Sequence, residues 1–467
     1  MLFSSIPFLY YFLPVVLILY FLAPKSMKNP VLLLSSLVFY GWGEPKYVFL
    51  MIATVLSGYV FGLLIEKFKS NKALSRLFLV LSVSSSLAAL AYFKYADFFI
   101  TNFNAVTGLS MPLLKLALPI GISFYTFQIL SYTVDVYRGQ VEAQKNPVNL
   151  ATYVALFPQL IAGPIVRYSD VAKQLVEREH SFDKAALGVR RFIFGFSKKI
   201  LLANTLGELG DAFLSTGDNA VLYHWLFVIS YMLQIYFDFS GYSDMAIGLG
   251  KILGFDFLEN FNYPFISKSI TEFWRRWHMS LGSWFRDYVY IPLGGNRVKR
   301  SRWLFNIFVV WFLTGFWHGA EWNFVIWGLY FGVLLTLEKF FWLKFVEKRK
   351  VLSHVYTLFF VAISFMIFAA GNLTQAVSLV SGMFGGKGMP LSSEEFIYQL
   401  RNYGFVLIIA IFGATPIPKK CVALLFEKCR AKFVLDIAEM LLLLILLVVS
   451  TAYLADGSFN PFLYFRF

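Results

Sequence analysis

The sequence predicts an all-helical integral membrane protein, because it is too apolar and too poor in charge for a soluble fold. Of its 467 residues, 58% are hydrophobic and 15% are charged, whereas soluble domains carry about 25% charged residues. One core cannot bury that much apolar surface, so lipid must solvate part of it. The 53 Phe, 26 Tyr and 11 Trp also supply aromatic side chains for both membrane interfaces.

Apolar runs of the length that a bilayer requires recur along the whole chain. A spanning helix needs about 20 mostly apolar residues, because lipid offers no partner to backbone groups. Candidate spans are 6–23, 30–42, 46–64, 76–93, 114–134, 221–248, 303–320, 322–343, 354–371, 402–418 and 433–455, with 192–208 weaker. The run 150–166 includes Pro164 and is expected to be broken or re-entrant. The sequence therefore predicts about 11 or 12 spans.

The basic residues predict how these spans are oriented. They form short clusters between apolar runs: Lys25 and Lys28; Lys67, Lys69, Lys72 and Arg76; Arg297, Lys299, Arg300 and Arg302; Lys344, Lys348, Arg349 and Lys350; Lys419, Lys420, Lys428, Arg430 and Lys432. Placed in the cytoplasm, all five clusters fit one topology of a cell membrane protein with both termini outside. This arrangement explains the net charge of +14 without a nucleic acid partner.

We expect one polytopic domain over residues 1–467, organised around its charge-rich middle. N-terminal helices occupy 1–134, a core with both candidate histidines 135–345, C-terminal helices 346–455, and an outer aromatic tail 456–467. The middle combines many Arg and Lys with Trp, Phe and Tyr, which is typical of short and re-entrant cytoplasm-facing helices around a cavity. Irregular backbone at membrane depth requires such cover by protein or water.

His318 is a candidate general base. It ends an apolar run in the segment Thr314-Gly-Phe-Trp-His-Gly-Ala-Glu-Trp322, and ionisable residues inside a membrane are costly and usually functional. A neutral imidazole accepts a proton near pH 7, as a general base must. The flanking Gly315 and Gly319 would let a helix or a substrate approach closely. A buried histidine bonded to a backbone carbonyl fits the residue equally well.

His278 lies in a second unusual segment, Glu272-Phe-Trp-Arg-Arg-Trp-His-Met-Ser-Leu281. One interpretation is an interfacial helix whose arginines meet lipid phosphates. The other is a pocket rim, where arginines bind a phosphate-bearing donor such as coenzyme A. The composition favours neither. The candidate substrate- or donor-binding residues are Arg275, Arg276, Arg286, Trp274, Trp277, Asp287, Asn296 and Trp317.

Asp238 and Asp244 interrupt another apolar run. We expect them to be structural partners of the arginines, because buried charges are usually paired, although a carboxylate here would also orient a histidine. The sequence contains no Gly-rich phosphate loop, no His/Cys metal spacing and no Gly-x-Ser-x-Gly elbow. We therefore expect no metal and no permanently bound cofactor.

The C-terminal segment Asn460-Pro-Phe-Leu-Tyr-Phe-Arg-Phe467 surrounds one arginine with aromatic residues. It suits an amphipathic tail lying on the outer leaflet. It equally suits a tail that inserts into the cavity and presents the Tyr464 hydroxyl to the reaction centre.

Together these motifs resemble the membrane-bound O-acyltransferase family, and in particular its bacterial alginate O-acetyltransferase-like branch. The matching stretches are 119–128, 157–164, 238–244, 260–265 and the two histidine segments. Each is weak alone, but their order and joint presence are specific. The segment Ile291-Pro-Leu-Gly-Gly-Asn-Arg297 is similar to this branch rather than to the D-alanyl transferase branch.

The resemblance implies many helices around a central tunnel, with His318 as the embedded catalytic histidine and His278 as the second functional one. The tail is similar to the C-terminal Tyr motif of a small partner in D-alanylation systems, which implies Tyr464 as an acyl acceptor or relay. We expect His318 to act as the base and His278 to help stabilise an oxyanion.

The expected function is therefore O-acetylation of a cell-surface or exported polysaccharide, as in alginate biosynthesis, with acetyl-coenzyme A as the cytoplasmic donor. An outer esterase-like (SGNH) partner with Ser-His-Asp chemistry is expected to complete the transfer, because this chain lacks that machinery. The alternatives are a transporter of lipid-linked sugars and a scaffold subunit of an exopolysaccharide synthase, which would both tolerate the loss of His318.

Overall fold

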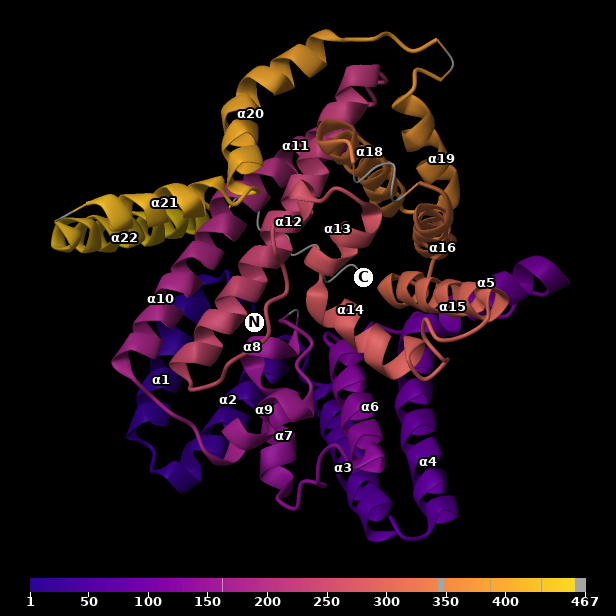
Figure 1. Cartoon of the computed structure of the whole chain (residues 1–467), viewed down its shortest axis with the longest axis vertical. Helices are drawn as coiled ribbons and strands as arrows, with labels where there is room; N and C mark the ends of the chain where they lie inside the picture. The colour runs from indigo at the N-terminus through magenta and orange to yellow at the C-terminus, as the bar shows by residue number, and fades with distance from the viewer. Residues whose placement is uncertain (162, 343–347, 387, 430, 458–467) are drawn as a thin grey trace. The chain divides into compact units, whose positions relative to one another are not determined.

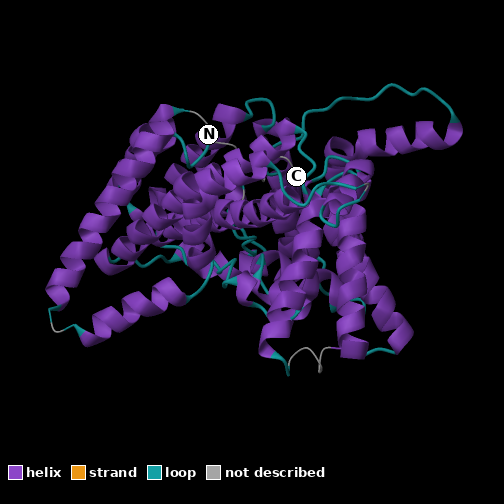
Figure 2. Ribbon diagram, turned by 90° about the horizontal axis from the view of Figure 1, so that it is seen from above, coloured by secondary structure: helices purple, strands orange, loops and turns teal. Residues whose placement is uncertain are grey.

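The computed structural model describes residues 1–161, 163–342, 348–386, 388–429 and 431–457, and it consists of helices joined by loops (Figure 1, Figure 2). These described ranges contain no β-strand, which confirms the predicted fold class. The chain forms two compact units. The first comprises Met1–Phe192 and Met245–Leu258, and the second comprises Ile193–Asp244 and Glu259–Phe467.

The first unit contains the N-terminal helices. They are α1 (Leu13–Leu22), α2 (Lys28–Gly43), α3 (Val48–Lys67), α4 (Lys72–Leu90), α5 (Ala96–Thr107), α6 (Ile122–Arg138), α7 (Pro147–Ala155), α8 (Phe157–Leu160), α9 (Tyr168–Val176) and most of α10 (Phe182–Ser197). Short π- or 3₁₀-helical turns at Pro7–Phe12, Lys25–Met27 and Ala91–Tyr95 join or extend them.

Helices α3, α4 and α6 lie side by side in this unit (Figure 1). Two glycines one helical turn apart on α3 allow the close contact with α6. A Cβ added at Gly58 would lie 2.6 Å from the Ile129 side chain, and one at Gly62 would lie 2.6 Å from the Tyr132 hydroxyl. Small residues of this kind let membrane helices approach closely where dispersion forces must hold them together.

The second unit contains the remaining helices. They are α11 (Thr205–Thr216), α12 (Val221–Ile252, whose end lies in the first unit), α13 (Ile270–Arg276), α14 (Met279–Phe285), α15 (Arg300–His318), α16 (Trp322–Leu337), α18 (Lys350–Ala369), α19 (Leu373–Gly382), α20 (Glu394–Gly413), α21 (Ile417–Lys428) and α22 (Lys432–Asp456). Turns at Lys198–Asn204, Pro264–Ile266, Arg286–Tyr290 and Glu338–Trp342 complete it.

Six helices within the described residues are long and apolar enough to cross a membrane. They are Val48–Lys67, Lys72–Thr107, Trp322–Trp342, Lys350–Ala369, Glu394–Gly413 and Lys432–Asp456. The other predicted spans form helices that are shorter or less apolar. The prediction of a multi-pass membrane protein is confirmed.

Some predicted spans differ from the helices in their bounds. The span 114–134 begins late, because α6 starts at Ile122 after Gly121, whose φ of +76° places it in the left-handed region. The run 150–166 is broken as expected, since α7 ends at Ala155 and the short α8 follows. Helix α20 begins at Glu394, ahead of the predicted span 402–418, because Ser393 accepts a hydrogen bond from the Phe396 amide and caps it there.

Candidate active site

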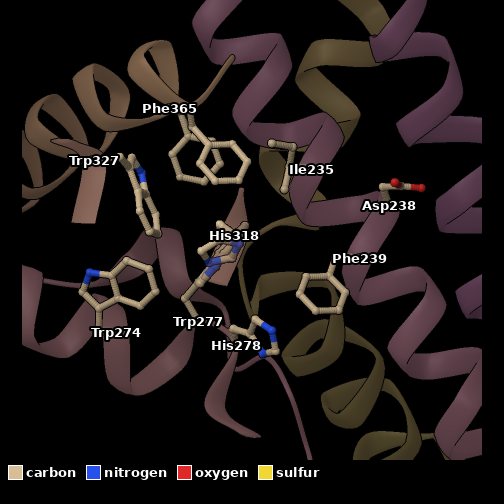
Figure 3. Close-up of a pocket in the computed structure, with 10 residues that line it drawn as sticks. Ile235, Asp238, Phe239, Trp274, Trp277, His278, His318, Trp327 and Phe365 are labelled. Atoms are coloured by element: carbon tan, nitrogen blue, oxygen red, sulfur yellow. The ribbon is translucent and has the colours of Figure 1, made fainter. Parts of the chain in front are cut away.

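A buried cavity within the second unit contains both candidate histidines (Figure 3). Its lining residues come from α12, α13, α15, α16, α18 and the turn before α14: Ile235, Asp238, Phe239, Trp274, Trp277, His278, His318, Trp327, Phe365 and Phe368. The cavity volume is about 40 Å³. One water needs about 10–15 Å³ on the same measure, so the space suits a few waters or a two-carbon acyl group.

His318 is the last residue of α15 and is held among aromatic rings. Its ring centroid lies 5.0 Å from those of Trp317 and Trp327 and 5.4 Å from that of Phe368, all in edge-to-face geometry. Only 7% of the residue is exposed. Edge-to-face contacts of this kind fix the plane of a ring, so the imidazole has a defined orientation in the cavity wall.

Two glycines bring His318 and Trp327 together where α15 crosses α16. The Cβ that would be added at Gly328 lies 3.0 Å from the Gly315 Cα, and one at Gly315 lies 3.1 Å from the Gly328 Cα. The two backbones therefore touch without an intervening side chain. The close approach expected from Gly315 is present. Gly319 has a related role, because a Cβ there would collide with the Phe324 ring.

In a Gly328→Ala variant the free energy of unfolding is expected to fall by about 1–3 kcal/mol, because the added methyl group forces α15 and α16 apart. It should also lose activity, because Trp327 would shift against His318. Thermal unfolding in detergent measures the stability, and Gly404→Ala is the matched control because a Cβ at Gly404 meets nothing within 4 Å. Equal unfolding temperatures for the two variants would contradict the role of the crossing.

His278 adopts an unusual backbone conformation. Its φ of 45° and ψ of 52° lie in the left-handed region, which non-glycine residues adopt at a cost and which is enriched at functional sites. The loop before α13 holds this turn. The Met279 amide donates to the Asn260 carbonyl at 2.9 Å, and the Ser280 amide donates to Asn260 Oδ1 at 3.3 Å.

Asn260 also fixes the tautomer of His278. The Ser280 backbone N–H can only donate, so the Asn260 atom that faces it is the amide oxygen. His278 Nδ1 lies 3.1 Å from this same oxygen, and so Nδ1 carries the proton. The Nδ2 group of Asn260 donates in turn to Ser243 Oγ at 3.1 Å. His278 Nε2 therefore carries the lone pair.

The protonation state of His278 follows from its tautomer and its burial. His278 lies outside the six apolar spans, and burial lowers its pKa to about 3, so the ring is neutral at physiological pH. A neutral ring with its proton on Nδ1 cannot donate from Nε2. In this tautomer Nε2 is a hydrogen-bond acceptor, and the expectation that His278 helps to stabilise an oxyanion remains a prediction.

A buried glutamate anchors the helix that carries Trp274 and Trp277. The Glu338 carboxylate, at the end of α16, accepts from the Thr271 amide at 2.9 Å and the Thr271 hydroxyl at 2.7 Å, and also from the Ile270 amide. These amides belong to the first turn of α13, where orphan N–H groups and the helix dipole favour a negative charge. Glu338 thereby holds the tryptophan wall of the cavity in place.

Both aspartates form ion pairs with lysines. Asp238 Oδ1 lies 2.7 Å from Lys199 Nζ, and Asp244 Oδ2 lies 2.6 Å from Lys198 Nζ. The first pair is almost fully buried, with side-chain exposures of 3% and 2%. The expected ion pairing is present with lysines, and pairing of these aspartates with arginines remains a prediction. Figure 3 shows the Asp238 carboxylate pointing away from both imidazoles, consistent with a structural role.

The predicted substrate- and donor-binding residues fall into two groups. Trp274 and Trp277 line the cavity, and Trp317 contacts both imidazole rings. The other residues, which do not line the cavity, are Arg275, Arg276, Arg286, Asp287 and Asn296.

The residues outside the cavity make local contacts. Arg276 Nη2 pairs with Glu272 at 2.8 Å, and Arg286 forms two contacts with Asp287, at 2.6 and 3.0 Å. Asn296 accepts from Tyr290, at the end of the preceding turn, and from Trp303 on α15. Arg275 is exposed. Donor binding by these residues remains a prediction, and Tyr464 lies outside the described residues.

Sequence reasoning missed two kinds of site residue. Asn260 and Lys199 were given no role, although Asn260 belongs to a motif that carried the family resemblance. Trp327 and Phe368 complete the aromatic wall around His318, and no local pattern separates them from the many other aromatics of apolar helices. A polar residue such as Asn260 in a motif rich in aromatics was the available signal.

The described structure is thus a helical membrane protein with a buried cavity that two imidazoles line. Comparison with known proteins identifies the class of protein: the model of the membrane-bound O-acyltransferase family matches residues 47–380. The chain belongs to this family, and it is an O-acyltransferase.

Full-length relatives support the resemblance to the alginate-type branch. A probable alginate O-acetylase of Azotobacter vinelandii is 39% identical over 499 residues, covering 100% of both chains. One of Pseudomonas putida is 39% identical over 487 residues, again covering 100% of both. The peptidoglycan O-acetyltransferase of Helicobacter pylori is 33% identical over 517 residues, covering 100% of this chain and 98% of that protein.

Proposed function

We propose that this chain transfers the acetyl group of cytoplasmic acetyl-coenzyme A through the membrane for O-acetylation of an exported or cell-surface polysaccharide. The observation that carries the proposal is the small aromatic cavity lined by both His318 and His278. Its volume fits a two-carbon acyl group. Relatives named as O-acetylases or O-acetyltransferases of alginate and peptidoglycan, similar over the whole chain, support acetyl as the group and a polysaccharide as the acceptor.

In the proposed reaction His318 is the general base. Its imidazole removes the proton of an acceptor hydroxyl, and the oxygen attacks the acetyl carbonyl of the thioester. A C–O bond forms, the C–S bond breaks, and the coenzyme A thiolate takes the proton back from the imidazolium. A positioned base contributes about 10²- to 10⁴-fold, and the aromatic wall limits the water that would hydrolyse the thioester.

His278 has a separate part in this proposal. Because Nε2 carries its lone pair, the ring accepts a hydrogen bond from the substrate and positions it. Arg275, Arg276 and Arg286 are proposed to bind the phosphates of coenzyme A at the cytoplasmic mouth. Arg275 and Arg286 are exposed, as a first contact with a soluble donor requires.

The proposal is tested by following thiol release from acetyl-coenzyme A with the purified protein in detergent. Wild-type protein should release free coenzyme A faster than a His318→Gln variant of the same stability, and acetyl-coenzyme A should be preferred over palmitoyl-coenzyme A, whose chain exceeds the cavity. Equal release by the wild type and the variant would overturn the proposed site. A preference for the long chain would overturn acetyl as the transferred group.

The C-terminal tail is proposed to receive the acetyl group on Tyr464 and to pass it to an outer esterase-like partner protein. This step rests on the similarity of the tail to the partner motif of D-alanylation systems and on the predicted outer location of both termini in the cytoplasmic membrane. The partner would then esterify the polysaccharide.

A Tyr464→Phe variant is expected to lose acetyl labelling of the tail and to lower polymer acetylation at least about tenfold, because the attacking hydroxyl is gone. Mass spectrometry of the tail peptide after incubation with labelled acetyl-coenzyme A measures the first effect. Tyr453→Phe, on the exposed face of α22, is the matched control. Normal polymer acetylation by Tyr464→Phe would remove the relay and leave the base assignment intact.

A further inference from the structure

A cluster of cationic groups in the first unit surrounds the side chain of Tyr20, at the end of α1. Lys28 Nζ lies 4.6 Å from the Tyr20 ring centroid, and Arg178 Cζ lies 5.8 Å from it. His180 Nε2 is 2.9 Å from the Tyr20 hydroxyl, which donates at 2.7 Å to the Leu253 carbonyl. Because the Tyr20 hydroxyl donates to Leu253, His180 Nε2 donates its proton to the Tyr20 oxygen. Lys28 and Arg178 thus bring two positive charges to the same side chain.

The arginine of this cluster is held in a fixed orientation. Arg178 Nη2 donates to Asn29 Oδ1, and Asn29 Nδ2 donates to Asn149 Oδ1 at 2.7 Å and to the Leu175 carbonyl at 2.8 Å. The guanidinium also lies over the Phe255 ring, with Cζ 4.8 Å from the centroid. Its other terminal nitrogen, Nη1, is buried and makes no hydrogen bond within the described structure.

The positive charge of the cluster is not neutralised by any residue that the structure describes. Among the described residues, no carboxylate lies within ion-pair distance of Lys28, Arg178 or His180. Lys184, close in sequence, is by contrast paired with Asp256 at 2.7 Å. Burial, and after it the charges of Arg178 and Lys25, lower the pKa of Lys28. A buried guanidinium nitrogen beside uncompensated cations is stabilised by an anion.

We propose that Lys28 and Arg178 form a phosphate-binding site beside Tyr20 and His180. Guanidinium and ammonium groups are the usual ligands of phosphate in proteins. The shared chemistry is a phosphate ester, from a phospholipid headgroup or from a soluble phosphate.

The surface beside the site favours a phospholipid over a soluble phosphate. Phe21 is 48% exposed and Leu22 is 79% exposed, and the Phe21 ring lies 5.5 Å from Lys28 Nζ. Exposed apolar residues of α1 would thus pack acyl chains next to the cations that bind the headgroup. Basic clusters next to membrane helices bind anionic lipids in this way, and the predicted topology places Lys25 and Lys28 at the cytoplasmic leaflet.

Native mass spectrometry of the full chain in detergent, titrated with phosphatidylglycerol or phosphatidylcholine, tests the proposal. Wild-type protein should bind phosphatidylglycerol at least about tenfold more tightly, because the choline cation is repelled by the cluster. Arg178→Gln should weaken this binding about tenfold, the loss expected for one charge-assisted hydrogen bond. Arg76→Gln, which removes one exposed positive charge elsewhere, should leave the affinity unchanged.

A second variant and a second ligand complete the test. Lys28→Gln should weaken phosphatidylglycerol binding in the same way. If Arg178→Gln does not fold, the affinity of Lys28→Gln tests the proposed site. Inorganic phosphate added without lipid separates the two sources: binding of millimolar phosphate that depends on Arg178 and is not displaced by phosphatidylglycerol would assign the site to a soluble phosphate. Binding of both ligands that is unchanged in Arg178→Gln and Lys28→Gln would overturn the site.

Discussion

Replacing His318 by glutamine is expected to lower acetyl transfer by about 10²- to 10⁴-fold, the usual contribution of a positioned general base. Glutamine keeps a polar side chain of similar length but cannot accept a proton at neutral pH. The ring contacts with Trp317, Trp327 and Phe368 would be lost with the imidazole, so the stability of the variant must be measured beside its activity.

Polymer acetylation in cells and thiol release from acetyl-coenzyme A with purified protein measure this effect. His354→Gln is the matched control, because His354 on α18 donates from Nδ1 to the Ser267 carbonyl and does not line the cavity. The base assignment fails if His318→Gln, present in the membrane at normal amounts, acetylates as well as the His354 variant.

Replacing Asn260 by leucine is expected to lower acetyl transfer by roughly 10²-fold. Without the Asn260 oxygen as acceptor, the His278 proton is no longer held on Nδ1, and both tautomers of the ring become populated. The change removes the acceptor for His278 Nδ1 and for the Ser280 amide. Each buried N–H left without an acceptor costs about 1–3 kcal/mol. The strained turn at His278 would therefore relax as well.

Nitrogen NMR of the ¹⁵N-labelled histidines separates this positioning role from general destabilisation. The wild type should show a neutral His278 with its proton on Nδ1, and Asn260→Leu should show a mixture of tautomers. Asn104→Leu is the control, since Asn104 makes comparable hydrogen bonds to the Met111 backbone without a histidine. An unchanged tautomer and full activity in Asn260→Leu would refute the role of this residue.

Composition and spacing were sufficient to predict the class of the fold. The apolar runs predict the spanning helices because, in lipid, every backbone group must be hydrogen-bonded within its own segment. The bounds were less certain where breaks depend on single residues. Because of Gly121, α6 begins later in the chain than the apolar run, and because of Ser393, α20 begins earlier. Both effects come from backbone geometry and capping rather than from hydropathy.

The site was only partly accessible from sequence. His318 and His278 were identifiable because ionisable residues are rare in such apolar surroundings, and both line the cavity. The residues that pair around the site could not be identified from sequence, because pairing depends on which helix faces reach the cavity. The sequence offers several basic residues as possible ion-pair partners of Asp238, and in the fold Lys199 lies next to it. Asn260 precedes His278 by 18 residues, and only the folded loop brings the two together.

The most direct test of the account is a cryo-electron microscopy structure of the wild-type protein with a non-hydrolysable acetyl-coenzyme A analogue. The account predicts that the acyl end of the analogue enters the cavity lined by His318 and His278, with the phosphates near Arg275, Arg276 and Arg286. An analogue bound with its acyl end at any other place, and with this cavity closed to it, would contradict the assignment of the reaction to the two histidines.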